Sequence, residues 1–268
     1  MELAVDIQGQ GTPILCLHGH PGSAACLQVI CDHLATNYQT IAPDLRGYGR
    51  SWTSQSFELT DHLVDLQALL DRLGIECCIL LGWSLGGILA LELALQQPER
   101  FSGLILIASA AAPRSDHPPI GWRDNLLTVL AGLCNQLQPG ASWHIDRLGK
   151  HSLLQYLLQT HTPATYRYLA TAGTPAFFKT SPAAHQSLNR ALRGRYNRLP
   201  DLTQLTQPAL VLAGSCDRHI TPSASQATAE ALPNSHFICY PYVAHLFPWE
   251  IPVRVNQDLQ NWLQQKSL

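Results

Sequence analysis

The chain carries little charge. Asp, Glu, Lys and Arg make up 13% of its 268 residues, and the formal net charge is −2. The charged share is about half of that in an average soluble protein. A nearly neutral chain creates no global field that would attract nucleic acid or an anionic membrane, so we expect neither as a partner. The low charge also indicates an apolar surface, at a substrate entrance or a subunit contact.

Signals for export and for membrane insertion are missing as well. The stretch Met1–Asp6 lacks the basic and apolar regions of a signal peptide. No apolar run approaches the roughly 18 residues of a membrane-spanning helix. The eight cysteines form no C-x-x-C pair, and without an export signal we expect reduced thiols in a cytoplasmic protein.

Motifs for phosphate or metal chemistry are absent too. The sequence contains neither G-x-x-x-x-G-K-[ST] nor H-E-x-x-H, the patterns that cradle phosphates or hold zinc on a helix. We therefore expect no metal and no cofactor.

Short apolar runs alternate with helical patterns along most of the chain. This alternation predicts an α/β fold with a mostly parallel central sheet flanked by helices. We expect strands at Leu3–Ile7, Pro13–Leu17, Thr40–Asp44, Glu76–Leu81, Leu104–Ala108, Ala209–Ala213 and His236–Tyr240. We expect helices at Ser23–Ala35, Thr60–Leu73 (with Thr60 as its cap and Gly74 as its stop), Leu85–Gln97 and Val253–Leu263.

The strand signal vanishes between Pro113 and about Leu199. Apolar residues recur at helical spacing over Arg123–Leu137, and Thr162-Pro163 and Ser181-Pro182 are typical of helix starts. We expect a core formed by residues 1–112 and 200–268, with an all-helical cap at 113–199 placed over the ends of the strands.

The most informative stretch is Gly82-Trp83-Ser84-Leu85-Gly86, which lies between an expected strand and an expected helix. In this context G-x-S-x-G forms a sharp turn that lifts one serine hydroxyl clear of the sheet. The glycines allow backbone to approach where side chains would collide. Serine is a weak nucleophile, so it needs a base, an orienting acid and an oxyanion site.

Two later residues can supply the base and the acid. Asp217 and His245 each follow an expected strand. Both are therefore expected at the carboxyl edge of the sheet, where open α/β sheets bind their ligands. With Ser84 they give the chain order Ser, Asp, His. Asp201 precedes its strand, His236 begins one and His219 neighbours Asp217, so all three are poorer candidates.

The oxyanion site is expected to combine two backbone N–H groups, those of Leu85 and of His20 in the loop His18-Gly19-His20-Pro21-Gly22. The His20 ring could contact substrate or lie at the rim of the pocket. Trp83 adjoins the nucleophile and is our candidate for substrate binding. Asp44 and the glycines of Asp44–Ser51 are interpreted as turn scaffolding.

Together these residues resemble the α/β-hydrolase superfamily over nearly the whole chain. The resemblance implies the triad Ser84, Asp217 and His245 beneath a helical cap. Epoxide hydrolases and haloalkane dehalogenases have aspartate at the position of Ser84, which argues against both activities. Ala244 stands where the superfamily often has glycine before the base, and we expect little consequence.

The block Leu80–Gly87, with Pro98-Glu99-Arg100, is similar to that of carboxylesterases acting on pimeloyl-carrier-protein methyl ester. That resemblance implies an acyl ester substrate and an acyl carrier protein as a partner for a basic cap. The basic residues available are Arg147, Lys150, Arg167, Arg190, Arg193, Arg195 and Arg198. A solvated helix face explains the same charges equally well.

Three functions remain open from the sequence. The first is a serine esterase that forms an acyl-enzyme on Ser84, with no cofactor. The second is a carbon–carbon bond hydrolase or lyase that uses the same triad on a ketone. The third is a non-catalytic ligand-binding protein on a hydrolase fold.

Overall fold

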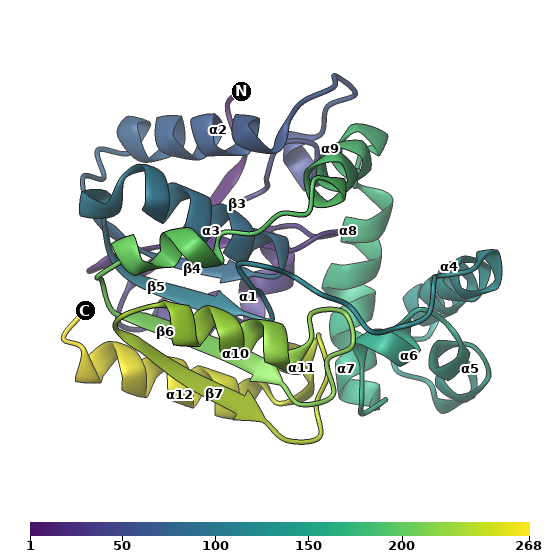
Figure 1. Cartoon of the computed structure of the whole chain (residues 1–268). Helices are drawn as coiled ribbons and strands as arrows, with labels where there is room; N and C mark the ends of the chain where they lie inside the picture. The colour runs from purple at the N-terminus through teal and green to yellow at the C-terminus, as the bar shows by residue number, and fades with distance from the viewer.

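Seven strands form one sheet in the computed structural model, which describes residues 1–268 (Figure 1). Their order across the sheet is β1-β3-β2-β4-β5-β6-β7. Only β1 runs antiparallel to its neighbour, so the predicted mostly parallel sheet is confirmed. The strands are β1 (Val5–Gln8), β2 (Pro13–Leu17), β3 (Gln39–Pro43), β4 (Cys78–Trp83), β5 (Phe101–Ile107), β6 (Ala209–Gly214) and β7 (Ser235–Tyr240).

Side chains of the central strands alternate between two buried layers. In β4, Ile79 and Leu81 pack in the layer that also contains α1 (Gln28–Leu34) and α12 (Pro252–Gln265). Cys78 and Leu80 pack in the opposite layer with helices α2, α3 and α10. Those helices span α2 (Leu59–Arg72), α3 (Leu85–Gln96) and α10 (Pro222–Ala231). Both faces are covered, which explains why the strands read as continuous apolar runs.

The start of one predicted helix needs correction, and one helix was not predicted. Helix α2 begins at Leu59 with Glu58 as its N-cap, not Thr60, because Asp61 accepts a hydrogen bond from the Glu58 N–H at 2.8 Å. Gly74 does follow the end of this helix, with φ of +67°. Helix α10 was not predicted, since the residues it buries are small: Ala224, Ser225, Thr228 and Ala229.

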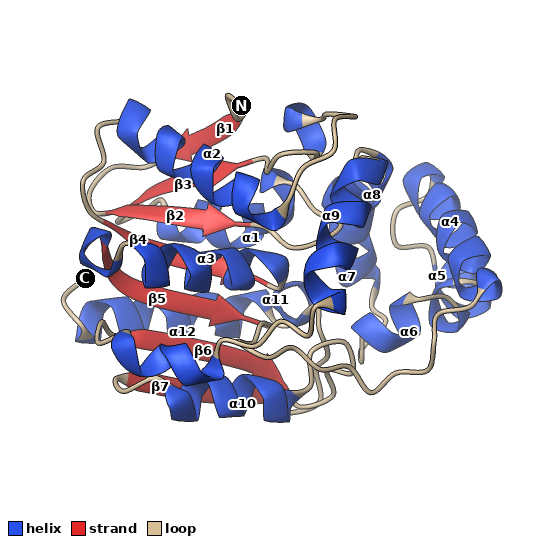
Figure 2. Ribbon diagram, turned by 45° about the horizontal axis from the view of Figure 1, so that its top comes forward, coloured by secondary structure: helices blue, strands red, loops and turns tan.

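The segment between residues 113 and 199, which we propose to be a cap, contains helices and no strand. They are α4 (Trp122–Leu137), α5 (Ser142–Arg147), α6 (Leu154–Leu157), α7 (Pro163–Tyr168), α8 (Thr174–Phe178) and α9 (Pro182–Arg193). Thr162 and Ser181 cap α7 and α9 through their hydroxyls, as predicted. Figure 2 shows the strand arrows pointing toward these helices, so the cap lies at the carboxyl edge of the sheet.

The remaining features concern the chain as a whole. All eight cysteines are free thiols. None of the helices combines the length and the apolar character needed to cross a bilayer. No group of three or more His, Cys, Asp or Glu side chains is arranged to hold a metal ion.

Candidate active site

Ser84 occupies a strained turn between β4 and α3. Its φ of +55° and ψ of −116° lie outside the regions that L-residues ordinarily adopt. Hydrogen bonds hold the residue on both sides. Its N–H donates to Ile107 O at 2.9 Å, and its carbonyl accepts from the Ser109 hydroxyl at 2.8 Å. The neighbouring strand and loop therefore stabilise the turn that holds Ser84, a buried residue that lines a cavity.

The glycines of this turn are needed for close backbone packing. A Cβ placed on Gly86 would overlap the carbonyl oxygen of Leu17, and one placed on Gly82 would overlap the backbone of Gly86. Helix α3 thus lies directly against the end of β2. Any larger residue at Gly86 would push the helix away from the strand.

Asp217 and His245, which are 28 positions apart in the chain, meet beside this turn. His245 Nδ1 lies 2.8 Å from Asp217 Oδ2. The other oxygen, Oδ1, accepts hydrogen bonds from the backbone N–H groups of His219 and Ile220 at 2.8 and 2.9 Å. Because a buried carboxylate only accepts, His245 Nδ1 carries the proton and Nε2 is left as the basic nitrogen.

The Ser84 and His245 side chains line the same cavity, which has a volume of about 460 Å³ and is called the Ser84 cavity below. No hydrogen bond joins the Ser84 hydroxyl to His245 in this structure. In enzymes without substrate this bond is often long, and it tightens when the substrate binds. The structure therefore brings Ser84, Asp217 and His245 into one site with the serine–histidine contact open.

The loop after β2 lies directly against Ser84. A Cβ on Gly19 would stand 3.1 Å from the Ser84 Cβ. The backbone N–H of His20 donates no hydrogen bond within the protein. Leu85 is the first residue of α3, where helix N–H groups lack intrahelical partners and the helix end carries partial positive charge. Two amide donors are thus available beside the serine.

The rings of His18 and His20 have different environments. His18 is fully buried, accepts from the Leu45 N–H at Nε2 and bonds Gly19 O through Nδ1, so it ties two loops together. The His20 ring lies between Tyr48 Oη at 2.8 Å and His185 Nδ1 at 2.9 Å. Burial lowers the pKa of His18 to about 4. Burial, together with the neighbouring histidines, lowers the pKa of His20 to about 3.

His219 packs edge-on against the proposed base. The centroids of the His219 and His245 rings are 4.7 Å apart. Burial lowers the pKa of His219 to about 3, with a further contribution from His245. His219 thus stays neutral at physiological pH, and its own Nδ1 faces His117 at 3.4 Å.

Trp83 lines the Ser84 cavity, as does the His20 ring. Most lining side chains are apolar, and none is Asp, Glu, Lys or Arg. The cavity is therefore suited to an uncharged ligand, because an ionised group would lose its hydration there without gaining a charged partner.

The structure places Asp201, His236 and Asp44 outside this site, whereas His219 lies beside His245. Asp201 pairs with Arg198 before β6, and His236 is exposed on β7. Asp44 accepts hydrogen bonds from Ala24 N, Arg50 N and Arg50 Nε, which agrees with its interpretation as turn scaffolding.

Many residues that line the cavity were not predicted, and two of them, His185 and Trp249, contact residues of the site. His185 lies on α9, in the cap, and Trp249 lies on the short helix α11 (Phe247–Glu250) just after His245. Neither belongs to a recognisable motif. The only sequence signal for His185 was its place on an amphipathic helix with a predicted cap. The only signal for Trp249 was its place four residues after His245.

A strained serine between strand and helix, with Asp217 and His245 at the same edge of a parallel sheet, defines the class of protein. The chain belongs to the α/β-hydrolase fold family, whose model matches residues 12–252.

Known relatives cover nearly the full length. An uncharacterized hydrolase of Bacillus subtilis, YugF, is 26% identical, covering 94% of this chain and 89% of its own. A pimeloyl-[acyl-carrier protein] methyl ester esterase of Aeromonas hydrophila is 29% identical, covering 91% and 92%. The solved structure of a thermophilic esterase from Thermogutta terrifontis is 25% identical, with a TM-score of 0.72 over 98% of this chain and 93% of that one.

Proposed function

We propose that this protein hydrolyses carboxylic esters through an acyl-enzyme on Ser84. The observation that carries the proposal is the bond between His245 Nδ1 and the buried carboxylate of Asp217, beside a serine in a strained turn. It leaves Nε2 as the basic nitrogen of His245, a residue that lines the Ser84 cavity. The named esterases among the relatives support the same conclusion.

In the first half of the reaction, Ser84 Oγ attacks the ester carbonyl carbon and gives its proton to His245 Nε2. The oxyanion accepts hydrogen bonds from the backbone N–H groups of His20 and Leu85. When the tetrahedral intermediate collapses, the alcohol leaves with the proton of His245. Asp217 keeps the imidazole oriented and stabilises it while it is charged.

In the second half, water attacks the acyl-enzyme. His245 takes a proton from the water and returns it to Ser84 Oγ, which releases the carboxylic acid. Because no charged side chain lines the Ser84 cavity, we expect neutral esters as substrates, with Trp83 contacting the bound chain.

The test is the Ser84→Ala variant assayed on p-nitrophenyl esters. Its turnover should fall by about 10⁶, as in other enzymes where the nucleophile of a triad is removed. A fluorophosphonate probe should label the native protein and not the variant. Ester hydrolysis at the native rate by Ser84→Ala would refute the acyl-enzyme. Failure of the native protein to react with the probe would favour a ligand-binding role.

The same triad could cleave a carbon–carbon bond in a ketone. Vinylogous diketones assayed beside the esters separate the two reactions. We expect the esters to be the better substrates, and the reverse order would assign the protein to the alternative class.

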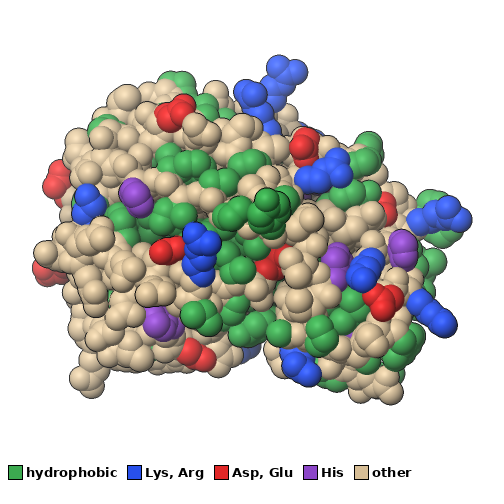
Figure 3. Space-filling view, turned by 90° about the horizontal axis from the view of Figure 1, so that it is seen from below, with side chains coloured by type: hydrophobic (Ala, Val, Ile, Leu, Met, Phe, Trp, Pro, Cys, Tyr) green, Lys and Arg blue, Asp and Glu red, His purple; other side chains and the backbone are tan.

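A carrier protein is a second part of the proposal, since relatives are named for an acyl-carrier-protein ester. Arg147, Arg167, Arg193 and Arg195 of the cap have no carboxylate within ion-pair distance, whereas Lys150, Arg190 and Arg198 do. On the face drawn in Figure 3, Lys and Arg side chains are scattered and do not form one patch. The Arg193→Glu/Arg195→Glu variant should raise KM for carrier-bound ester and leave free esters unaffected, with Lys266→Glu as control.

A further inference from the structure

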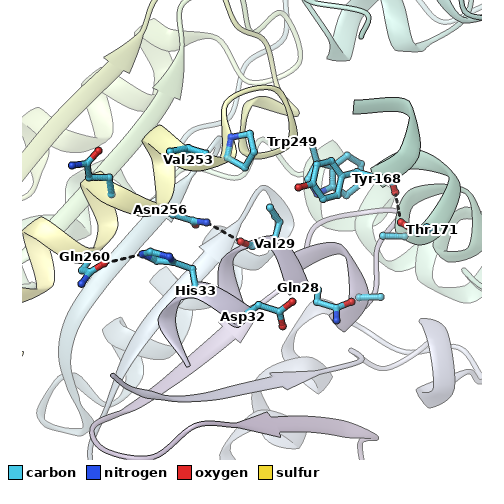
Figure 4. A pocket seen from close by; sticks show the side chains of 14 residues that line it. Gln28, Val29, Asp32, His33, Tyr168, Thr171, Trp249, Val253, Asn256 and Gln260 are labelled. Carbon is cyan, nitrogen blue, oxygen red and sulfur yellow. Dashed lines mark hydrogen bonds between the residues drawn. The ribbon is translucent and has the colours of Figure 1, made fainter. Parts of the chain in front are cut away.

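Two hollows of this protein share a single residue. The Ser84 cavity lies on one side of Trp249, and a separate hollow of about 690 Å³ lies on the other. This second hollow, called the outer groove, is bounded by α1, α12 and the π-helical turn η5 (Leu169–Gly173) (Figure 4). Trp249 is the only residue that lines both.

At Trp249 this one residue separates the two hollows, and neighbouring residues of two turns line different sides. On the 3₁₀ turn η1 (Ala24–Leu27), Cys26 faces the Ser84 cavity and Ala25 faces the outer groove. On η5, Gly173 faces the cavity and Ala172 faces the groove. The indole of Trp249 thus closes the gap between these two turns.

The indole is held firmly in this position. Its Nε1 donates to Cys26 O at 3.2 Å, and Trp249 as a whole residue is only 4% exposed. Trp83 meets it edge-on with centroids 5.2 Å apart, and Tyr168 stacks on it at 6.3 Å and 14°. Gly173 approaches so closely that a Cβ there would lie 3.2 Å from Trp249 Cη2. A ring packed on all these sides acts as a fixed wall.

The floor of the outer groove is held together by contacts that do not involve Trp249. His33 on α1 bonds Gln260 on α12 at 2.9 Å, and the Asn256 side chain donates to Val29 O at 2.9 Å (Figure 4). These contacts join the two helices that form the floor. Val29, Tyr168 and Val253 supply apolar surface among the polar side chains that also line the groove, so a hydrocarbon chain could lie along that apolar part once the indole was removed.

We propose that Trp249 is a specificity-determining residue that limits the length of the substrate's alkyl chain. A chain that extends from Ser84 past Trp83 meets the indole and cannot continue into the outer groove. The inference rests on the proposed ester hydrolysis and deepens it. The ligand class is an ester whose alkyl chain ends inside the Ser84 cavity.

The experiment compares the native protein with Trp249→Ala on two series of esters. One series lengthens the acyl group from acetate to palmitate, and the other lengthens the alcohol of an acetate ester. In Trp249→Ala, kcat/KM for the first chains that the native protein rejects should rise by about tenfold or more, since one accommodated methylene is worth roughly 10- to 200-fold. A shift in the acyl or the alcohol series supports the inference and identifies which chain reaches the wall.

Control variants test whether a change in chain-length preference arises from the loss of the Trp249 side chain. Trp143→Ala removes a cap tryptophan that is 47% exposed and lines neither hollow, so its length profile should match the native one. Adding Val253→Trp to Trp249→Ala should cancel the gain, because Val253 is exposed and lines the groove. Trp249→Leu serves if the alanine variant does not fold.

An unchanged length limit in a folded, probe-reactive Trp249 variant would overturn the inference while leaving the esterase in place. Absence of ester hydrolysis by the native protein would instead refute the proposed function itself.

Discussion

His20 Nε2 and His185 Nδ1 lie 2.9 Å apart, and this contact joins the loop beside Ser84 to helix α9 of the cap. The buried phenol of Tyr48 bonds the other nitrogen of His20. The Tyr48 proton has no other acceptor in the structure, so Tyr48 donates to His20 Nδ1. His20 Nε2 therefore carries the proton that is donated to His185.

These two hydrogen bonds, from Tyr48 to His20 and from His20 to His185, predict the effect of the His185→Phe substitution. The apolar ring would fill the space and leave the N–H of the half-buried His20 without an acceptor, a loss of about 1 kcal/mol, the low end of the cost for a buried donor. Urea unfolding should show a decrease of that size in the free energy of unfolding. Gln186→Ala, at an exposed position on the same helix, is the control and should change little.

Asp217→Asn should inactivate the protein without unfolding it. The Oδ1 position accepts from two backbone N–H groups, so the amide oxygen of asparagine will occupy it and turn its NH₂ toward His245 Nδ1. His245 then carries its proton on Nε2 and cannot accept one from Ser84. We expect kcat to fall by about 10⁴, as in other Ser-His-Asp enzymes.

Asp116→Asn is the control for that variant, because Asp116 is an exposed carboxylate paired with Arg218 beside the same loop. Its esterase rate should stay near the native value. A rate for Asp217→Asn within about tenfold of native would mean that His245 does not depend on Asp217 for its tautomer.

Stability should fall as the pH drops below neutrality. Burial, with some repulsion from His18, lowers the pKa of His62 to about 4 from its ordinary value of 6.5. Between these two values the unfolded chain takes up a proton that the folded protein does not, so the free energy of unfolding decreases as the pH falls from 6.5 to about 4. His18 contributes in the same direction.

The measurement is urea unfolding at several pH values in that window. His62→Phe removes one of the groups, and Tyr48 and Phe57 already surround the site with aromatic rings. The decrease in stability should therefore be smaller in His62→Phe than in the native protein. Equal pH dependence in the two proteins would show that the pKa of His62 is the same in the folded and the unfolded chain.

Gly86→Ala should damage both fold and activity. The new Cβ would overlap Leu17 O, so α3 must shift and carry Ser84 and the Leu85 amide with it. Overpacking of this kind typically costs about 1–3 kcal/mol, occasionally more. Thermal unfolding and ester hydrolysis report the two effects, and Gly194→Ala is the control, since its Cβ meets only an ordinary contact at 3.5 Å.

Local sequence patterns predicted those parts of the site whose structure is set by residues adjacent in the sequence. The turn at Ser84 is encoded within five positions, because Gly82 and Gly86 are needed wherever strand and helix backbones approach this closely. Asp217 and His245 could be located because parallel strands bring their carboxyl ends to one edge. Helix α10 escaped prediction because its buried side chains are small and give little hydrophobic periodicity.

The sequence by itself determined the order of the candidate catalytic residues along the chain: the serine turn comes first, then Asp217, then His245. Only the tertiary structure decided which distant residues complete the cavity. His185 is 165 positions from its partner His20, and the Trp249 indole bonds a carbonyl 223 positions away. Such contacts arise from how the helical segment and α11 pack on the sheet, and packing between distant segments leaves no mark in local spacing.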